Sequence, residues 1–184
     1  MILTNDKKIA LIILILVLLF VIGFAIKVIY DKKYAISETT KSIFSDGQED
    51  SVFYTDIKGN KISLEQYLGK VLIVTSWASW TPFSTTELAS VSELSTLYSQ
   101  DKVVFLAINR KETREQAERF VNTIPTLNSS LILVLDTRDH FYTSIGGYAM
   151  PETVLYDKKG NIIEHIHGTL NKDKLKEKID SLLK

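Results

Sequence analysis

One uninterrupted apolar segment constrains the chain more than any other feature. Residues 9–26 are eighteen consecutive residues without a charged or polar side chain. As a helix they span about 27 Å, close to the bilayer's hydrocarbon core of about 30 Å. The apolar residues 28–30 extend the segment, and Lys27 can reach the interface. A cleaved signal peptide has a shorter apolar region followed by a small-residue cleavage site. We therefore predict an uncleaved transmembrane signal anchor over residues 9–30.

The remaining sequence divides around this anchor. Residues 1–8 form a short tail, the polar residues 31–50 are typical of a tether, and residues 51–184 form one folded domain. Lysines lie on both sides of the anchor, so charge alone does not decide its orientation. The 22 basic and 22 acidic residues give no net charge. A nucleic-acid-binding function, which needs a basic surface, is not expected.

The chain contains no cysteine. Disulfides, thiolate nucleophiles, zinc–thiolate sites and iron–sulfur clusters are therefore excluded. We expect no cofactor.

Hydrophobic periodicity predicts alternating strands and helices in the domain. Strands are predicted at 52–57, 61–62, 71–76, 103–109, 131–135, 153–157 and 162–167, and helices at 63–68, 82–100, 112–123 and 171–183. Strand–helix–strand alternation that ends in a hairpin and a helix predicts an α/β fold, with a mixed central sheet and helices on both faces.

Two segments resemble the thioredoxin-like superfamily. V-L-I-V-T-S-W-A-S-W-T-P-F-S, at residues 71–84, is similar to the strand, turn and helix that carry the motif W-A-x-W-C-x-x-C. G-Y-A-M-P-E-T-V-L-Y-D-K-K-G-N-I-I, at 147–163, resembles the G-x-x-x-P-E-T-x-L-x-D-x-x-G-x-I segment of membrane-anchored redoxins of the TlpA/DsbE/ResA type. The resemblance implies a thioredoxin-like fold over about residues 50–184. It also implies a single-pass protein of the cell membrane, with the N-terminus inside and the domain outside the cytoplasm.

The chain departs from this family at its reactive atoms. Thr81 stands where the family has its nucleophilic cysteine, Ser84 replaces the resolving cysteine, and the acid that many thioredoxins bury would fall at Thr75. Disulfide exchange needs a thiolate, and a hydroxyl cannot replace it. Residues 80–88 also resemble a peroxiredoxin stretch with Ser84 at the peroxidatic position, but peroxide reduction through a sulfenic acid requires sulfur too. We therefore expect no catalytic residue.

Other patterns offer simpler roles for these hydroxyls. Thr81 before Pro82 fits a helix N-cap, and Ser84 with Glu87 three residues later fits a capping box. A hydrolytic role for Ser84 would need an oriented base. No G-x-S-x-G motif occurs, and the histidines lie far along the chain.

A binding groove around the degenerate motif is the main site hypothesis. Its predicted residues are Trp77, Trp80, Thr81, Pro82, Phe83, Ser84, Met150, Pro151 and Glu152. The resemblance places the family's cis-proline at Pro151, where preceding backbone groups stay free to pair with an extended peptide. The alternatives are that Trp77 packs in the core and that Glu152 is a carboxylate at the surface or the groove rim.

Two histidines raise the question of a metal. His165 and His167 are two residues apart, so on a strand they share a face. The sequence places no third ligand, and we expect a solvated strand face without a metal.

Three functional interpretations stay open. The first is a non-catalytic, membrane-anchored module that binds a protein or peptide partner outside the cytoplasm. The second is an accessory component of a thiol–disulfide oxidoreductase or cytochrome c maturation pathway that works with a partner's cysteines. The third is a diverged copy that has kept no role.

Overall fold

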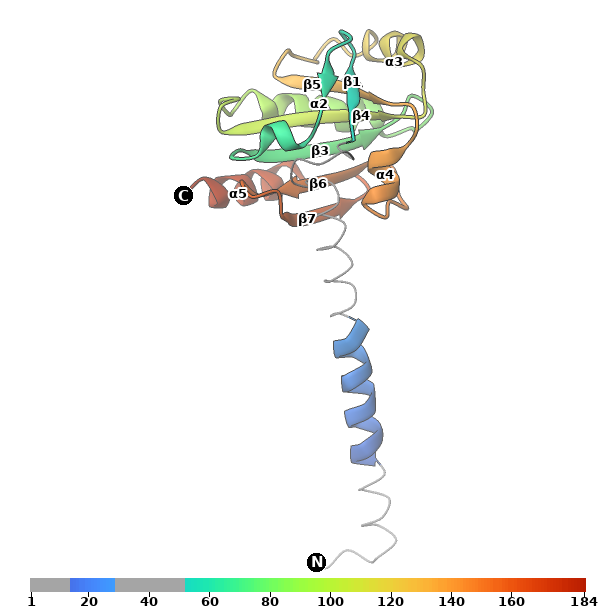
Figure 1. Cartoon of the computed structure of the whole chain (residues 1–184), viewed down its shortest axis with the longest axis vertical. Helices are drawn as coiled ribbons and strands as arrows, with labels where there is room; N and C mark the ends of the chain where they lie inside the picture. The colour runs from blue at the N-terminus through green and yellow to red at the C-terminus, as the bar shows by residue number, and fades with distance from the viewer. Residues whose placement is uncertain (1–13, 29–51) are drawn as a thin grey trace, which may run out of the picture. The chain divides into compact units, whose positions relative to one another are not determined.

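The computed structural model describes residues 14–28 and 52–184, which belong to two units (Figure 1). Residues 14–28 form a helix. Within the two described ranges, no helix combines the length and the hydropathy that a bilayer crossing requires. The predicted tail and tether lie outside the described residues, as do residues 9–13 and 29–30 at the ends of the predicted anchor.

The domain is built on one mixed sheet of seven strands, in the order β2-β1-β5-β4-β3-β6-β7. Its elements are β1 (Tyr54–Asp56), β2 (Lys61–Ile62), the 3-10 helix η1 (Glu65–Tyr67), β3 (Val71–Trp77), α2 (Ser84–Ser95), β4 (Val103–Arg110), α3 (Arg114–Val121), β5 (Leu131–Asp136), α4 (His140–Ser144), β6 (Glu152–Tyr156), β7 (Ile162–His167) and α5 (Lys172–Leu183). The strands β3, β4 and β5 are parallel, and β6 runs antiparallel to β3.

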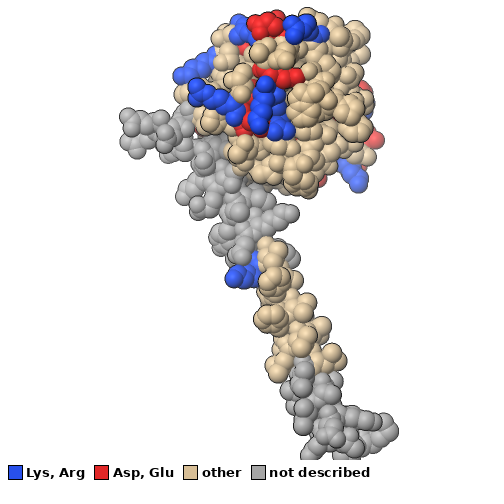
Figure 2. Space-filling model, turned by 90° about the vertical axis from the view of Figure 1, so that its right-hand side faces the viewer, with Lys and Arg blue, Asp and Glu red and all other residues tan. Residues whose placement is uncertain are grey.

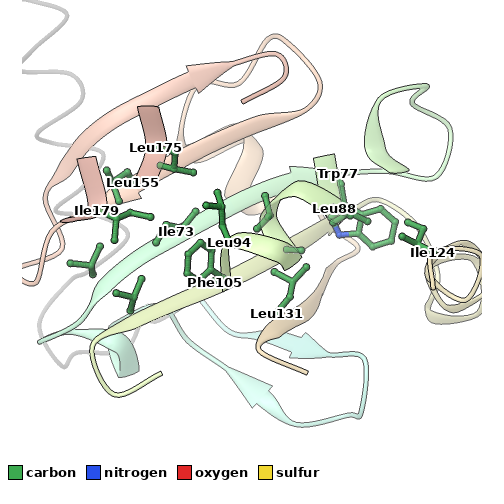
Figure 3. Packing of buried hydrophobic residues seen from close by; sticks show 14 of the residues in the cluster. Ile73, Trp77, Leu88, Leu94, Phe105, Ile124, Leu131, Leu155, Leu175 and Ile179 are labelled. Atoms are coloured by element: carbon green, nitrogen blue, oxygen red, sulfur yellow. The ribbon is translucent and has the colours of Figure 1, made fainter. Parts of the chain in front are cut away.

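Apolar side chains cover both faces of this sheet, as the continuous hydrophobic runs of β3 and β4 predict. On one face, α2, α3 and α5 pack over Ile73 and Phe105. Figure 3 shows Trp77, Leu88 and Ile124 together in this cluster. On the other face, η1 and Phe141 of α4 pack against Leu72 and the inward side chains of β4. The predicted α/β architecture with helices on both faces is confirmed.

The predicted elements occur in the predicted order, but the structure adds the short helix α4 after β5, and each predicted helix is shorter than expected. The helix predicted from residue 82 begins at Ser84, and the helix predicted from Glu112 begins at Arg114. In the second case, Thr113 is the N-cap and forms a capping box with Gln116. Asn171 caps α5 as predicted, because its side chain accepts a hydrogen bond from the Lys174 N–H.

Candidate functional site

The strand register brings the two family-like segments together. Ser76, near the carboxyl end of β3, is opposite Glu152, the first residue of β6. The Met150–Pro151 bond therefore adjoins the turn that connects β3 to α2. This peptide bond is cis, as the resemblance implies.

Thr81 lies in this turn and Ser84 is the first residue of α2, and both residues are buried. The Ser84 hydroxyl donates a hydrogen bond to the Ala78 carbonyl over 2.8 Å and contacts the Thr81 hydroxyl. The Thr81 hydroxyl also donates to the Ala78 carbonyl, over 3.2 Å. The two residues that replace the cysteines thus close the turn that precedes α2.

The predicted capping roles of Thr81 and Ser84 are wrong. Phe83 is the N-cap of α2 and makes no side-chain cap bond. The Ser84 hydroxyl is engaged with the Ala78 backbone and with Thr81. In residues 52–184, neither an imidazole nor a carboxylate contacts it, so nothing there can remove its proton for nucleophilic attack.

The aromatic residues of the motif divide between the core and the surface. Trp77 is 1% exposed and stacks on Phe120 with ring centroids 5.5 Å apart, which places it in the core rather than on a surface groove. Trp80 and Phe83 are 62% and 53% exposed. Tyr148, in the loop before the cis-proline, is 76% exposed. Large aromatic side chains therefore project from both loops of the site.

Pro82 is exposed, Met150 is half-buried and Pro151 is buried. Among the described residues, the Met150 N–H and C=O have no hydrogen-bond partner. A bound peptide strand can pair with such a free backbone donor and acceptor.

The buried carboxylate of Glu112 holds the motif turn from the β4 side. It accepts a hydrogen bond from the Ser79 N–H over 2.9 Å and contacts the Ser79 hydroxyl. The Asn109 amide at the end of β4 also donates to it, over 2.6 Å. This network fixes the backbone just before Trp80.

Glu87 is a buried acid, although its spacing from Ser84 in the sequence predicts only a capping role. It is 2% exposed and accepts hydrogen bonds from the Thr153 hydroxyl and the Leu170 N–H, over 3.3 and 3.2 Å. Thr153 is in turn 2.9 Å from the Thr75 hydroxyl. Burial raises the pKa of Glu87 to about 7, because the two hydrogen bonds only partly offset the loss of hydration. The family's buried-acid position at Thr75 is thus linked to an acid from α2.

Glu152 is fully buried, so its expected place at the surface or rim is wrong. Its Oε1 accepts hydrogen bonds from the N–H groups of Tyr148 and Ala149 over 2.7 and 2.6 Å, which replace the lost water. Burial by itself would raise the pKa of Glu152. The two backbone hydrogen bonds and the contacts with His165 and His167 outweigh burial, so the pKa is lowered.

His165 and His167 share a face of β7, as predicted, but they do not form the expected solvated face. His165 Nε2 lies 2.7 Å from Glu152 Oε2, and His167 Nδ1 lies 3.2 Å from Glu152 Oε1. Only 15% and 30% of the two side chains is exposed. Their pairing with a residue of β6 was missed, because the register of the hairpin decides it.

A second ion pair supports the loop before the cis-proline. Arg110 binds Asp139 with two hydrogen bonds of 2.7 and 2.6 Å, and these lower the pKa of the Asp139 carboxyl. The guanidinium lies 3.2 Å from the ring centroid of Tyr142, whose hydroxyl donates to the Ala149 carbonyl over 2.7 Å. The buried Tyr142, whose ring contacts the Arg110 guanidinium, thus holds this loop through its hydrogen bond to Ala149.

Other concave parts of the domain lie away from this site. A cavity of about 600 Å³ opens beside β1 and the end of α3, lined by residues that include Ile57, Ile124 and Leu133. None of the predicted groove residues lines it.

The mixed sheet, the cis-proline and the motif turn define a thioredoxin-like domain in which two hydroxyls occupy the dithiol positions. A family model described as Redoxin matches residues 27–183. The chain belongs to the redoxin family, and its relatives include thiol-disulfide oxidoreductases named ResA.

Two relatives illustrate the range of similarity. The thiol-disulfide oxidoreductase ResA of Geobacillus thermodenitrificans (strain NG80-2) is 29% identical over 175 residues, which cover 92% of each chain. The thiol:disulfide interchange protein HelX of Rhodobacter capsulatus is 30% identical over 115 residues, which cover 62% of each chain.

Solved structures agree with the fold. A secreted Mycobacterium tuberculosis disulfide oxidoreductase homologous to E. coli DsbE has a TM-score of 0.62 at 19% identity, over 72% of this chain and 96% of that one. StoA from Bacillus subtilis has a TM-score of 0.57 at 23% identity, over 68% of this chain and 93% of that one.

Proposed function

We propose that this redoxin is a non-catalytic, membrane-anchored module that binds an extended segment of a partner protein beside the cis-proline. The observation that carries the proposal is the pairing of exposed aromatic side chains with a free backbone edge. Trp80, Phe83 and Tyr148 supply exposed aromatic surface, and Met150 supplies the unpaired N–H and C=O. Aromatic anchors give affinity, while backbone pairing gives direction and register.

Charged side chains are unevenly distributed over one side of the domain (Figure 2). On the side of the domain that Figure 2 presents, much of the surface carries neither basic nor acidic side chains, and the charged ones gather on part of it. The buried hydroxyls of Thr81 and Ser84 support the same function, because they stabilise the turn without offering a reactive atom.

The anchor forms part of this proposal. Residues 9–30 supply the apolar length, and residues 14–28 are helical. A module tethered at the outer face of the membrane would meet partners at a raised local concentration.

Crosslinking in native membranes tests the binding function. The full chain is crosslinked, and captured proteins are compared with those of Trp80→Ala and Met150→Asp variants. Leu97→Ala is the matched control, because the Leu97 side chain is largely exposed, as that of Trp80 is, but Leu97 follows the C-terminal end of α2. We expect capture of the same partner by the parent chain and Leu97→Ala, and its loss in both site variants. Equal capture by all four proteins would refute the proposal.

A second candidate is an accessory role beside a thiol oxidoreductase. The similarity to ResA over most of both chains favours it. It predicts that deleting the protein changes the redox state of extracytoplasmic thiols, which thiol trapping measures. Unchanged thiol states would exclude it and leave the binding function standing.

A further inference from the structure

We propose that Glu152, His165 and His167 bind a divalent transition metal, with Zn²⁺ as the best fit. One ligand atom from each residue lies within 4.8 Å of the other two. Two imidazole nitrogens and one carboxylate oxygen are a ligand set that zinc uses when a fourth position stays open. The inference does not depend on the proposed binding function.

The hairpin of β6 and β7 brings the three side chains together. Glu152 is directly opposite His167, and His165 is two residues before His167, on the same face of β7. The backbone ladder therefore fixes the ligands on two adjacent strands. A site built on regular strands is held more rigidly than one built on loops.

The spacing fits a metal after a small adjustment. Ligand atoms about 2.0–2.1 Å from a tetrahedral zinc lie about 3.3 Å from one another. His167 Nδ1 is 3.2 Å from Glu152 Oε1, and one ligand atom from each of the three residues lies within 4.8 Å of the others, so these atoms would have to approach by at most about 1.5 Å around an ion. His165 Nε2 and Glu152 Oε2 are at the hydrogen-bonding distance of 2.7 Å, and a modest rotation of the imidazole would separate them.

Surrounding contacts orient the ligands. The N–H groups of Tyr148 and Ala149 donate to Oε1 of Glu152, while Oε2 faces His165. The Tyr148 ring stacks on His167 with centroids 4.3 Å apart. Hydrogen bonds and packing of this kind around the ligands are what tune metal affinity.

Charge and access also favour a cation. The only ion pairs of Glu152 within the described part of the chain are those with the two histidines. A divalent ion would therefore add compensating charge to a fully buried carboxylate that forms no ion pair with a lysine or arginine there, although the charge of Arg110 also acts on it. The partial exposure of both histidines leaves a side of the site open to solvent, where water or a partner's side chain can complete the coordination.

Zinc titration of the tag-free full chain, after removal of metals with EDTA, tests the site. Isothermal titration calorimetry measures affinity and stoichiometry, and the absorption bands of bound Co²⁺ report coordination geometry. The variants are His165→Gln and His167→Gln, and the matched control is His140→Gln, which changes the third histidine of the chain outside the cluster.

We expect one Zn²⁺ per chain, an affinity about tenfold or more weaker in each cluster variant, and unchanged affinity in the control. Thermal unfolding in EDTA confirms that the variants fold, and either variant alone is sufficient if the other does not. Absence of zinc binding by the parent chain would overturn the proposal. So would equal affinity in the parent and the cluster variants, or a loss in His140→Gln that matches theirs.

Discussion

Replacing Glu87 with glutamine should remove a pH-dependent loss of stability from the domain. Glu87 is 2% exposed, and burial raises its pKa from an ordinary value of 4.5 to about 7. In the unfolded chain the carboxyl is hydrated and titrates near its ordinary value. The folded chain therefore holds the proton more tightly than the unfolded chain does.

The sign of the effect follows from proton linkage. Between pH 4.5 and about 7, the folded state binds more protons at this group than the unfolded state, so raising the pH lowers the free energy of unfolding. A tenfold difference in proton affinity is worth about 1.4 kcal/mol. Ionised Glu87 thus costs the folded chain about 3 kcal/mol above pH 7, and this cost disappears as the carboxyl is protonated.

Glutamine can take the place of the protonated acid. Its amide oxygen can accept from the Leu170 N–H, and its amide N–H can donate to the Thr153 hydroxyl, which then donates to Thr75. The hydrogen-bond chain is retained without a charge. Glu87→Gln should therefore match the parent chain at pH 4.5 and exceed its stability by up to about 3 kcal/mol at pH 8.

Chemical denaturation of the full chain across this pH range measures the difference. Other carboxyl groups with perturbed pKa values, such as Asp139, contribute equally to both curves and cancel. Glu93→Gln is the matched control, because Glu93 is on the same helix but 67% of its side chain is exposed. Its curve should run parallel to that of the parent chain. A constant gap between Glu87→Gln and the parent chain at all pH values would refute the reasoning.

Three further substitutions probe the supports of the site, each measured by denaturant unfolding of the full chain. Gly147→Ala should cost about 1–3 kcal/mol, because a Cβ would lie 2.6 Å from the Tyr142 ring; an unchanged midpoint would contradict this packing. Glu112→Ala should cost about 1–3 kcal/mol by leaving the Ser79 N–H and the Asn109 amide without their acceptor, and a neutral result would show that water replaces it. Asn171→Ala should lower the free energy of unfolding by about 1 kcal/mol through loss of the cap on α5. Asn171→Ser should retain most of the stabilisation by the cap.

Local patterns predicted the framework well, because strands and helices of this fold follow side-chain periodicity. The continuous apolar run that became β3 is buried at every position. Asn171 was identified as a cap because its bond reaches only to Lys174, within the first turn of α5. The resemblance to redoxins also placed the cis-proline at Pro151, and this is confirmed.

The buried acids were harder to find. Glu87 occupies the same helical stripe as Val91 and Leu94, and this spacing was the available signal that it faces the interior. Its capping pattern with Ser84 suggested a helix terminus instead. For Glu112, the pattern indicated a helix start, but the residue lies before α3 and binds Ser79, 33 positions earlier in the chain.

The sequence by itself determined which chemistry this protein lacks and which family's fold it adopts. The absence of sulfur at Thr81 and Ser84 excludes disulfide exchange in any conformation. The local periodicity of hydrophobic side chains predicts the order of the strands and helices. Only the tertiary structure decided that Glu87 meets Leu170 across 83 positions and that Glu152 meets His165 across a hairpin. The physical reason is that burial and charge pairing depend on strand register and helix packing. These bring together side chains that are distant in the chain and whose sequence neighbours carry no sign of the contact.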